Sequence, residues 1–255
     1  MLLGLDFPPI SHLTEWDGFA FDGTPFEFNK VTLIYIVAVG LTLWFFGAAA
    51  RRGSLVPHGV QNMAEASVDF IKDSVIMQTI GPDGMRYLPL LTSMFFFIFF
   101  INIFEVVPFI QFPGNARMAV PLMLALLVWV LYIVLGIKVQ GPFGYLKNSL
   151  IPPGVPWPLL FLVVPIEFVS TFLVRPFSLA IRLFANMLAG HLILATFAIL
   201  CAALFSKTLL IVIVPFSFGL LIALTAFEIL VAGLQAFIFT ILTGVYVGSS
   251  LHPDH

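Results

Sequence analysis

The stretch RPFSLAIRLFANMLAGHLIL, residues 175–194, lies inside a long apolar run, yet it carries two arginines, an asparagine and a histidine. A charged side chain at the centre of a bilayer costs about 3 kcal/mol or more. Ionisable residues in such a place are rare and mark the pathways of ions or substrates. The stretch therefore predicts a functional site inside a membrane.

The composition of the whole chain is typical of an integral membrane protein. Of 255 residues, 60% are hydrophobic and 9% are charged, whereas about 25% are charged in a soluble domain. The chain has eleven Lys and Arg and thirteen Asp and Glu. It therefore lacks the excess of basic residues that would indicate a nucleic-acid partner. We therefore expect an all-α integral membrane protein in contact with a lipid bilayer.

Apolar stretches predict about five membrane crossings. Residues 31–50 form the first span, because about 20 residues cross the roughly 30 Å of hydrocarbon. Residues 88–137 predict a transmembrane hairpin with a Pro-Gly-Asn turn. The runs 155–205 and 208–247 exceed one span, since the second would make roughly 60 Å of helix. Each run either folds back or is a long, steeply tilted helix, and the lack of polar turns favours the long helix.

Two further segments complete the predicted organisation. Residues 57–78 have one apolar helical face, which predicts a helix lying on the membrane interface or packed against a partner subunit. Residues 1–30 carry no motif and are expected to form an extracytoplasmic tail, followed by a single membrane domain over 31–255. With this tail outside, six basic residues flank the spans on the inside and three on the outside, as the positive-inside rule requires.

This orientation sorts the intramembrane polar residues by depth. Glu105, His191 and Glu228 belong to the outer side, and Glu167 lies nearer the inside. Arg182 lies between the two groups, and its guanidinium does not deprotonate. Two titratable groups at different depths with a fixed cation between them predict two proton-accessible cavities separated by a barrier.

Helical spacing predicts which of these residues share a face. Ser178, Ala185 and Ala189 form a stripe of small residues with Arg182, and such a stripe lets another helix approach closely. His191, nine residues from the arginine, points to nearly the opposite side. An antiparallel packing of the two long runs would set Gln235 near Arg182 and Glu228 near His191.

Each polar residue also has a purely structural interpretation. Arg182 could form a salt bridge with an acid of its own chain, and His191 could hydrogen-bond a carbonyl. Asn186 and Gln235 could join helices, and Glu105 could simply be solvated near the interface. No catalytic triad, zinc motif or phosphate loop is present, so we expect neither chemistry on a substrate nor a cofactor or metal.

The stretch 175–194, with FEILVAGLQAFIFTILTGVYV at 227–247, closely resembles the subunit a family of the rotary F-type ATP synthases. The pattern R-L-F-A-N-M-x-A-G-H followed by L-Q-A-F-I-F is long and specific, and the resemblance extends from about residue 30 onward. It implies that Arg182 is the essential arginine that faces a ring of c subunits. The further residues that it places on the proton pathway are Asn186, His191, Glu228, Gln235, Glu105 and Glu167.

The same resemblance implies the function and its setting. The chain would be the stator of the Fo sector, with two offset proton half-channels that couple proton flow through the c-ring to ATP synthesis. It would be present in one copy per ATP synthase, beside the b subunits of the peripheral stalk, in a bacterial plasma membrane or, alternatively, a mitochondrial inner or thylakoid membrane. The competing hypotheses are a secondary ion transporter and a structural membrane anchor, although no inverted repeat supports a transporter.

Overall fold

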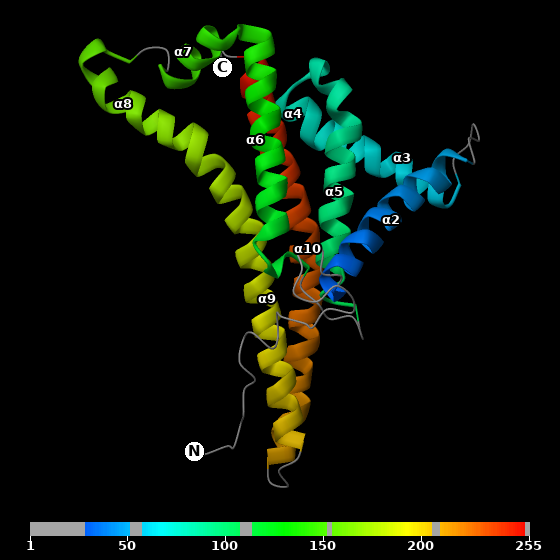
Figure 1. The fold of residues 1–255 in the computed structure, drawn as a ribbon. Helices are drawn as coiled ribbons and strands as arrows, with labels where there is room; N and C mark the ends of the chain where they lie inside the picture. The colour runs from blue at the N-terminus through cyan, green and yellow to red at the C-terminus, as the bar shows by residue number, and fades with distance from the viewer. Residues whose placement is uncertain (1–28, 52–57, 108–113, 152–154, 206–209, 253–255) are drawn as a thin grey trace. The chain divides into compact units, whose positions relative to one another are not determined.

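A computed structural model describes residues 29–51, 58–107, 114–151, 155–205 and 210–252 of the chain (Figure 1). Over these residues the chain is helical and contains no strand. Five helical segments in them are long and apolar enough to cross a membrane: Lys30–Ala50, Pro82–Ile103, Ala119–Gln140, Trp157–Phe205 and Val214–Leu251. The prediction of an all-α integral membrane protein with about five crossings is confirmed. The expected N-terminal tail lies almost wholly outside the described residues.

The element order follows the labels of Figure 1. The α-helices before the middle of the chain are α2 (Lys30–Ala50), α3 (Val60–Ile71), α4 (Met77–Thr79) and α5 (Leu88–Ile103). The later ones are α6 (Ala119–Gln140), α7 (Pro142–Leu150), α8 (Trp157–Val169), α9 (Arg175–Phe205) and α10 (Val214–Leu251). The 3-10 turns are η2 (Pro82–Tyr87), η3 (Gly114–Ala116) and η5 (Leu210–Ile213), and the π-helical turns are η1 (Lys72–Ile76) and η4 (Ser170–Val174).

The two long apolar runs are long helices. Helical structure continues from Trp157 to Phe205 through α8, the π turn η4 and α9, a run of 49 residues. Helix α10 has 38 residues, which is about 57 Å at 1.5 Å per residue. Pro215 lies in its first turn, where a missing N–H is tolerated. The alternative in which each run folds back is therefore wrong.

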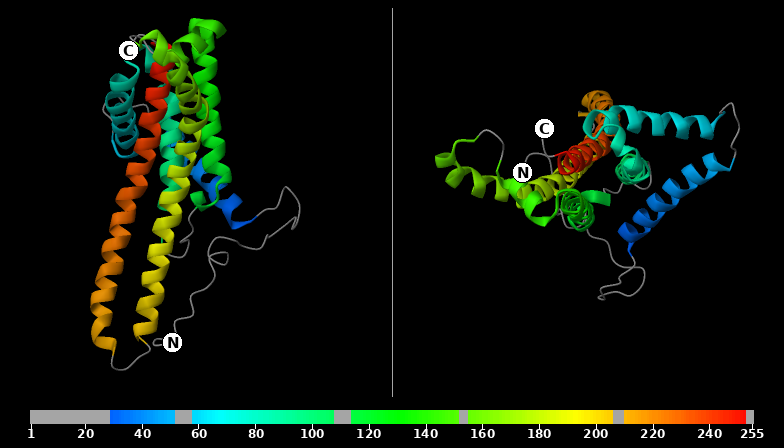
Figure 2. Two further views of the ribbon diagram at one scale, coloured as in Figure 1. Left: turned by 90° about the vertical axis from the view of Figure 1, so that its left-hand side faces the viewer. Right: turned by 90° about the horizontal axis from the view of Figure 1, so that it is seen from above.

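The contacts of the chain define two compact units, which we describe separately. Of the described residues, unit 1 comprises 29–42, 97–107, 114–117, 184–205 and 210–235. Within it, the later part of α9 runs antiparallel beside the first part of α10 (Figures 1 and 2). A second packing centre of unit 1 joins α2 to the end of α5 through Val31, Ile34, Ala38, Ile101 and Phe104. The Tyr35 hydroxyl also donates a hydrogen bond to the Gly114 carbonyl of η3.

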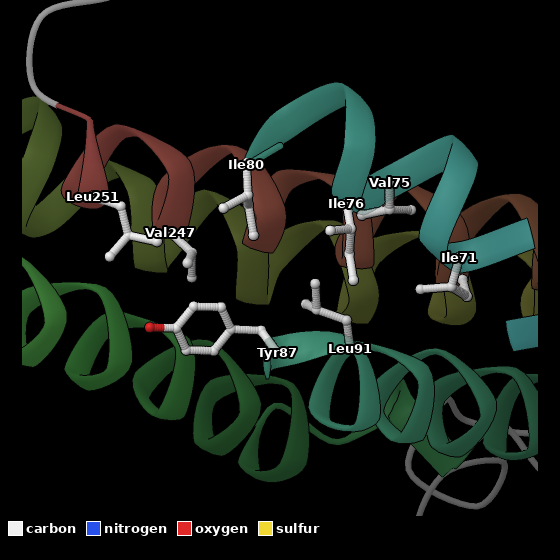
Figure 3. Close-up of a cluster of buried hydrophobic side chains, with 8 residues drawn as sticks. All are labelled: Ile71, Val75, Ile76, Ile80, Tyr87, Leu91, Val247 and Leu251. Carbon is white, nitrogen blue, oxygen red and sulfur yellow. The ribbon is translucent and has the colours of Figure 1, made fainter. Parts of the chain in front are cut away.

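Of the described residues, unit 2 comprises 43–51, 58–96, 118–151, 155–183 and 236–252. Its core lies where η1 and the residue after α4 meet η2, α5 and the end of α10 (Figure 3). The buried side chains there are Ile71, Val75, Ile76, Ile80, Tyr87, Leu91, Val247 and Leu251. Leu131 and Leu135 of α6 pack against this cluster.

The segment expected to be an interfacial helix forms α3, η1 and α4. In this segment Ala64 and Ile71 are buried, while Met63 and Phe70 are exposed. Gln61 donates a hydrogen bond to Glu65 one turn later, at 2.8 Å. Its location at a membrane interface stays a prediction.

Candidate functional site

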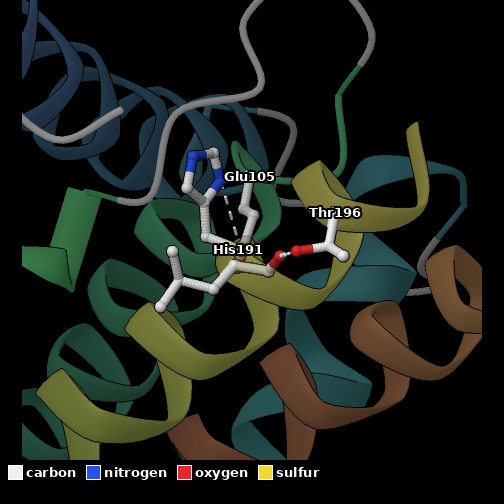
Figure 4. Close-up of polar contacts among 4 residues, drawn as sticks. Glu105, His191 and Thr196 are labelled. Atoms are coloured by element: carbon white, nitrogen blue, oxygen red, sulfur yellow. Dashed lines mark hydrogen bonds and ion pairs between the residues drawn. The ribbon is translucent and has the colours of Figure 1, made fainter. Parts of the chain in front are cut away.

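Glu105 and His191 face each other in unit 1 (Figure 4). His191 Nδ1 lies 3.8 Å from Glu105 Oε1, which is longer than a hydrogen bond. Glu105 is 3% exposed, and no described residue hydrogen-bonds its Oε1. Two titratable side chains thus meet in the interior without a direct hydrogen bond between them.

The backbone just past α5 positions Glu105. The Glu105 N–H donates to the Asn102 carbonyl at 3.2 Å, and the Val106 N–H donates to the Ile103 carbonyl at 3.1 Å. These bonds span three residues instead of four, so the chain tightens as it leaves the helix. The tightening takes Glu105 out of the helical periodicity of α5.

Glu228 lies against the residue that precedes His191. A Cβ added to Gly190 of α9 would lie 2.5 Å from Glu228 Oε2. The carboxyl group of this buried side chain on α10 therefore lies directly on the α9 backbone, and only glycine leaves the space for it. The sequence argument paired Glu228 with His191, whereas the structure sets Glu228 on Gly190 and Glu105 opposite His191.

Asn186 and Gln235 join α9 to α10 in the same unit. Asn186 Nδ2 donates a hydrogen bond of 2.7 Å to Gln235 Oε1. Gln235 is buried, and no described residue accepts a hydrogen bond from its Nε2. The pair is thus a direct link between the two long helices that still has a free donor.

A pair of buried asparagines in unit 1 is absent from the residues that we selected on sequence alone. Asn115 Nδ2 donates to Asn102 Oδ1 at 2.8 Å, and both side chains are buried. Asn115 belongs to η3, so the bond fixes this turn beside the end of α5, three residues before Glu105. Asn102 could have been found as a polar residue inside the apolar run FFINIFE, whereas the Pro-Gly-Asn motif predicts a turn at Asn115 but not its partner.

Arg182 and Glu167 belong to unit 2 and are both half-buried. On α9, Leu179, Ala180 and Leu183 form the buried side beside the arginine. In the stripe of small residues that includes Arg182, Ser178 is half-buried, and Ala185 and Ala189 are exposed. Within the described residues, no salt bridge joins Arg182 to an acid of this chain.

The site residues do not form a metal centre in the part of the chain that the structure describes. There, no group of three or more His, Cys, Asp or Glu side chains is placed to hold a metal ion. The chemistry available to Glu105, His191 and Glu228 is the binding and transfer of protons.

Comparison with known proteins identifies the family to which the chain belongs. The family model described as ATP synthase A chain matches residues 31–248. ATP synthase subunit a of Rhodococcus erythropolis is 42% identical over 240 residues, which are 90% of this chain and 85% of that protein. The same-named proteins of Frankia alni and Hyphomonas neptunium are 42% identical over 237 residues and 37% identical over 243 residues. These matches cover 89% and 95% of this chain and 79% and 94% of the two relatives. The apolar spans, the arginine-bearing helix and the polar residues on α10 all lie within the matched range, and the chain belongs to the ATP synthase A chain family.

Proposed function

We propose that this chain is the stator half of the proton channel of an ATP synthase, with two offset half-channels that lead protons to and from a rotating ring of c subunits. One observation carries the proposal: Glu105, His191 and Glu228 come from three segments and gather in one compact unit. The three relatives compared above are named ATP synthase subunit a. The family supports this function and neither of the alternatives, a secondary transporter or a structural anchor.

Protons enter from the outer side through the group around His191. A neutral imidazole can accept a proton on one nitrogen and release it from the other, which suits it to relay between carboxylates. The 3.8 Å separation from Glu105 supports a relay in which a small movement makes and breaks the contact. Glu228, against Gly190, is the next acceptor toward the ring.

Arg182 faces the c-ring and separates the two half-channels. Two opposite unit charges 4 Å apart attract by about 4 kcal/mol at an effective dielectric of about 20. A ring carboxylate beside Arg182 is therefore held ionised, so it releases its proton before it passes. The exposed alanines along the Arg182 stripe support close approach of a partner helix at this face.

The link between Asn186 and Gln235 holds α9 and α10 together between the entry group and the arginine. Its 2.7 Å hydrogen bond fixes the rotation of one long helix against the other. The unused Nε2 of Gln235 leaves one donor available to a water molecule or a passing carboxylate. We assign both residues to the lining of the proton path.

Glu167 marks the exit on the inner side. It precedes Arg182 by 15 residues, which is roughly 22 Å of helix. A half-buried carboxylate at this depth can accept the proton that a ring carboxylate releases. On this assignment residues 1–30 lie outside the membrane and the α3 segment lies on its inner surface.

The setting follows from the family. The chain is a multi-pass membrane protein that works with other ATP synthase subunits. We infer that it is present once per complex, beside the c-ring and the b subunits of the peripheral stalk, in a bacterial plasma membrane. The coupling ion is H⁺, since the described residues offer titratable groups at the entry.

The proposal is tested with sealed vesicles that carry the assembled complex. Arg182→Ala should abolish ATP-driven proton pumping and allow passive proton leakage, because the barrier between the half-channels is gone. Arg182→Lys should also fail, since an ammonium lacks the planar fork of donors. Ser178→Ala, on the same stripe, is the matched control and should pump normally. Coupled pumping by Arg182→Ala vesicles would show that the proposal is wrong.

A further inference from the structure

The π turn η4 separates α8 from α9 and is followed directly by a proline. In a π-helix, each N–H bonds to the carbonyl five residues earlier. The Arg175 N–H accordingly donates to the Ser170 carbonyl. The next donor in this register would be the N–H of residue 176, and its acceptor would be the Thr171 carbonyl. Residue 176 is proline, which has no N–H.

A side chain from another helix supplies the missing donor. The Tyr132 hydroxyl of α6 donates a hydrogen bond of 2.7 Å to the Thr171 carbonyl. Tyr132 is 1% exposed and Thr171 is 2% exposed, so no solvent replaces this bond. A backbone carbonyl without a partner is strongly unfavourable inside a membrane. The tyrosine hydroxyl therefore stabilises the π register at the point where Pro176 cannot.

The residues around this bond tie three helices together within unit 2. The Tyr132 ring lies 5.7 Å, between centroids, from the ring of Tyr246 on α10. The Arg175 guanidinium carbon lies 5.3 Å from the Tyr246 ring centroid, a cation–π distance. Side chains of α6 and α10 thus contact the start of α9 and the π turn before it. This turn sets the helical register of α9.

The register has a direct consequence for Arg182. A π turn accommodates one extra residue, so every later side chain takes the angular position of the residue before it in a regular α-helix. Without the Tyr132 hydroxyl, the Arg175 N–H can donate to Thr171 in α-helical spacing. That change rotates the later part of the helix by about 100°.

We infer that Tyr132 is a positioning residue for Arg182, which it keeps facing the c-ring by holding the π turn between α8 and α9. The inference rests on the role proposed above for Arg182. It also predicts which neighbour takes the place of the arginine after the change of register. That neighbour is Ile181.

The test uses Tyr132→Phe, which keeps the ring and removes the hydroxyl. In vesicles with equal amounts of assembled complex, ATP-driven proton pumping should fall roughly tenfold. The matched control is Tyr87→Phe, because no described residue hydrogen-bonds the buried Tyr87 hydroxyl. This variant should pump as the unmodified complex does.

A suppressor variant distinguishes a change of register from a general loss of packing. Exchanging two neighbours, Ile181→Arg with Arg182→Ile, should abolish pumping when Tyr132 is intact, because the arginine then faces away from the ring. Combined with Tyr132→Phe, the same exchange should restore pumping above the level of either parent, since α-helical spacing brings residue 181 to the ring. If the combined variant pumps no better than its parents while Arg182→Ala is inactive, the inference is overturned and the proposed function stands. If Arg182→Ala itself pumps normally, the proposed function fails.

Discussion

At the scale of single residues, the proposed proton entry path rests mainly on the contact between Glu105 and His191. The two atoms are 3.8 Å apart, so we expect the side chains to act as one coupled group. Glu105→Ala and His191→Ala should each slow proton uptake by roughly tenfold or more. The exchange Glu105→His with His191→Glu should recover part of the rate. Proton flux into vesicles is the measurement, and an exchange no better than the product of the two single losses would contradict the coupling.

A neighbouring polar side chain provides the control for this experiment. The Thr196 hydroxyl donates a hydrogen bond of 2.7 Å to the Leu192 carbonyl within α9 (Figure 4). This bond is local to the helix and contacts neither Glu105 nor His191. Thr196→Val should therefore leave the proton flux unchanged.

Gly190 is the second residue whose replacement has a defined outcome. The Cβ of Gly190→Ala would lie 2.5 Å from Glu228 Oε2, so the carboxyl group must move from α9. We expect a loss of proton flux, and we expect Glu228→Asp in the same chain to restore part of it, because the shorter side chain withdraws the carboxyl group. A Gly190→Ala complex with normal flux would show that the position of Glu228 is not critical.

The sequence identifies the candidate site residues, but it predicts only part of how their side chains pair. Polar residues inside apolar runs are recognisable as candidate functional residues, because placing each of them in lipid has a high free-energy cost. The expected antiparallel packing of the two long runs predicts that Glu228 lies near His191, but helical spacing gives no information about Glu105. This residue follows α5 in a tightened turn, where no period predicts the direction of the side chain.

At the scale of elements, the apolar runs predicted the long helices but not the π turns within them. Length and hydropathy determine that Trp157–Phe205 is helical. At the π turn η4, a tyrosine of α6 donates a hydrogen bond to a backbone carbonyl and the following proline has no N–H to offer it. A contact between distant segments cannot be predicted from local helix propensity.

The packing of α10 against the segment around α4 gives a prediction at this scale. A Cβ on Gly248 would overlap the Thr79 backbone carbonyl, which cannot turn away as a side chain can. Gly248→Ala should therefore destabilise the chain by about 1–3 kcal/mol. Gly219→Ala in the same helix meets nothing within 4 Å and should be neutral or stabilise by about 0.5–1 kcal/mol. Thermal unfolding of the purified complex measures both, and equal melting temperatures for the two variants would contradict the packing argument.

At the scale of the whole molecule, the proposed function and the predicted orientation both depend on where the charged residues lie along the chain. Entry and exit lie on opposite sides only if the outer group and Glu167 are at different depths, and the basic residues at the ends of the spans decide which side is which. The arrangement of the helices does not determine which side of the membrane each end of the chain faces. The orientation is therefore predicted from the sequence. It can be tested independently of proton transport.

Cysteine labelling on intact cells tests this orientation. In a chain with Cys201→Ser, the variant Ser11→Cys should react with a membrane-impermeant thiol reagent from outside. Asp83→Cys should react only after the cells are opened, because the six-to-three excess of basic residues places its turn inside. The Asp83 side chain is 76% exposed, so burial would not explain a lack of reaction. Labelling of both positions from the outside would contradict the single crossing predicted between them, and labelling of Asp83→Cys alone would reverse the orientation and with it the assignment of entry to the His191 side.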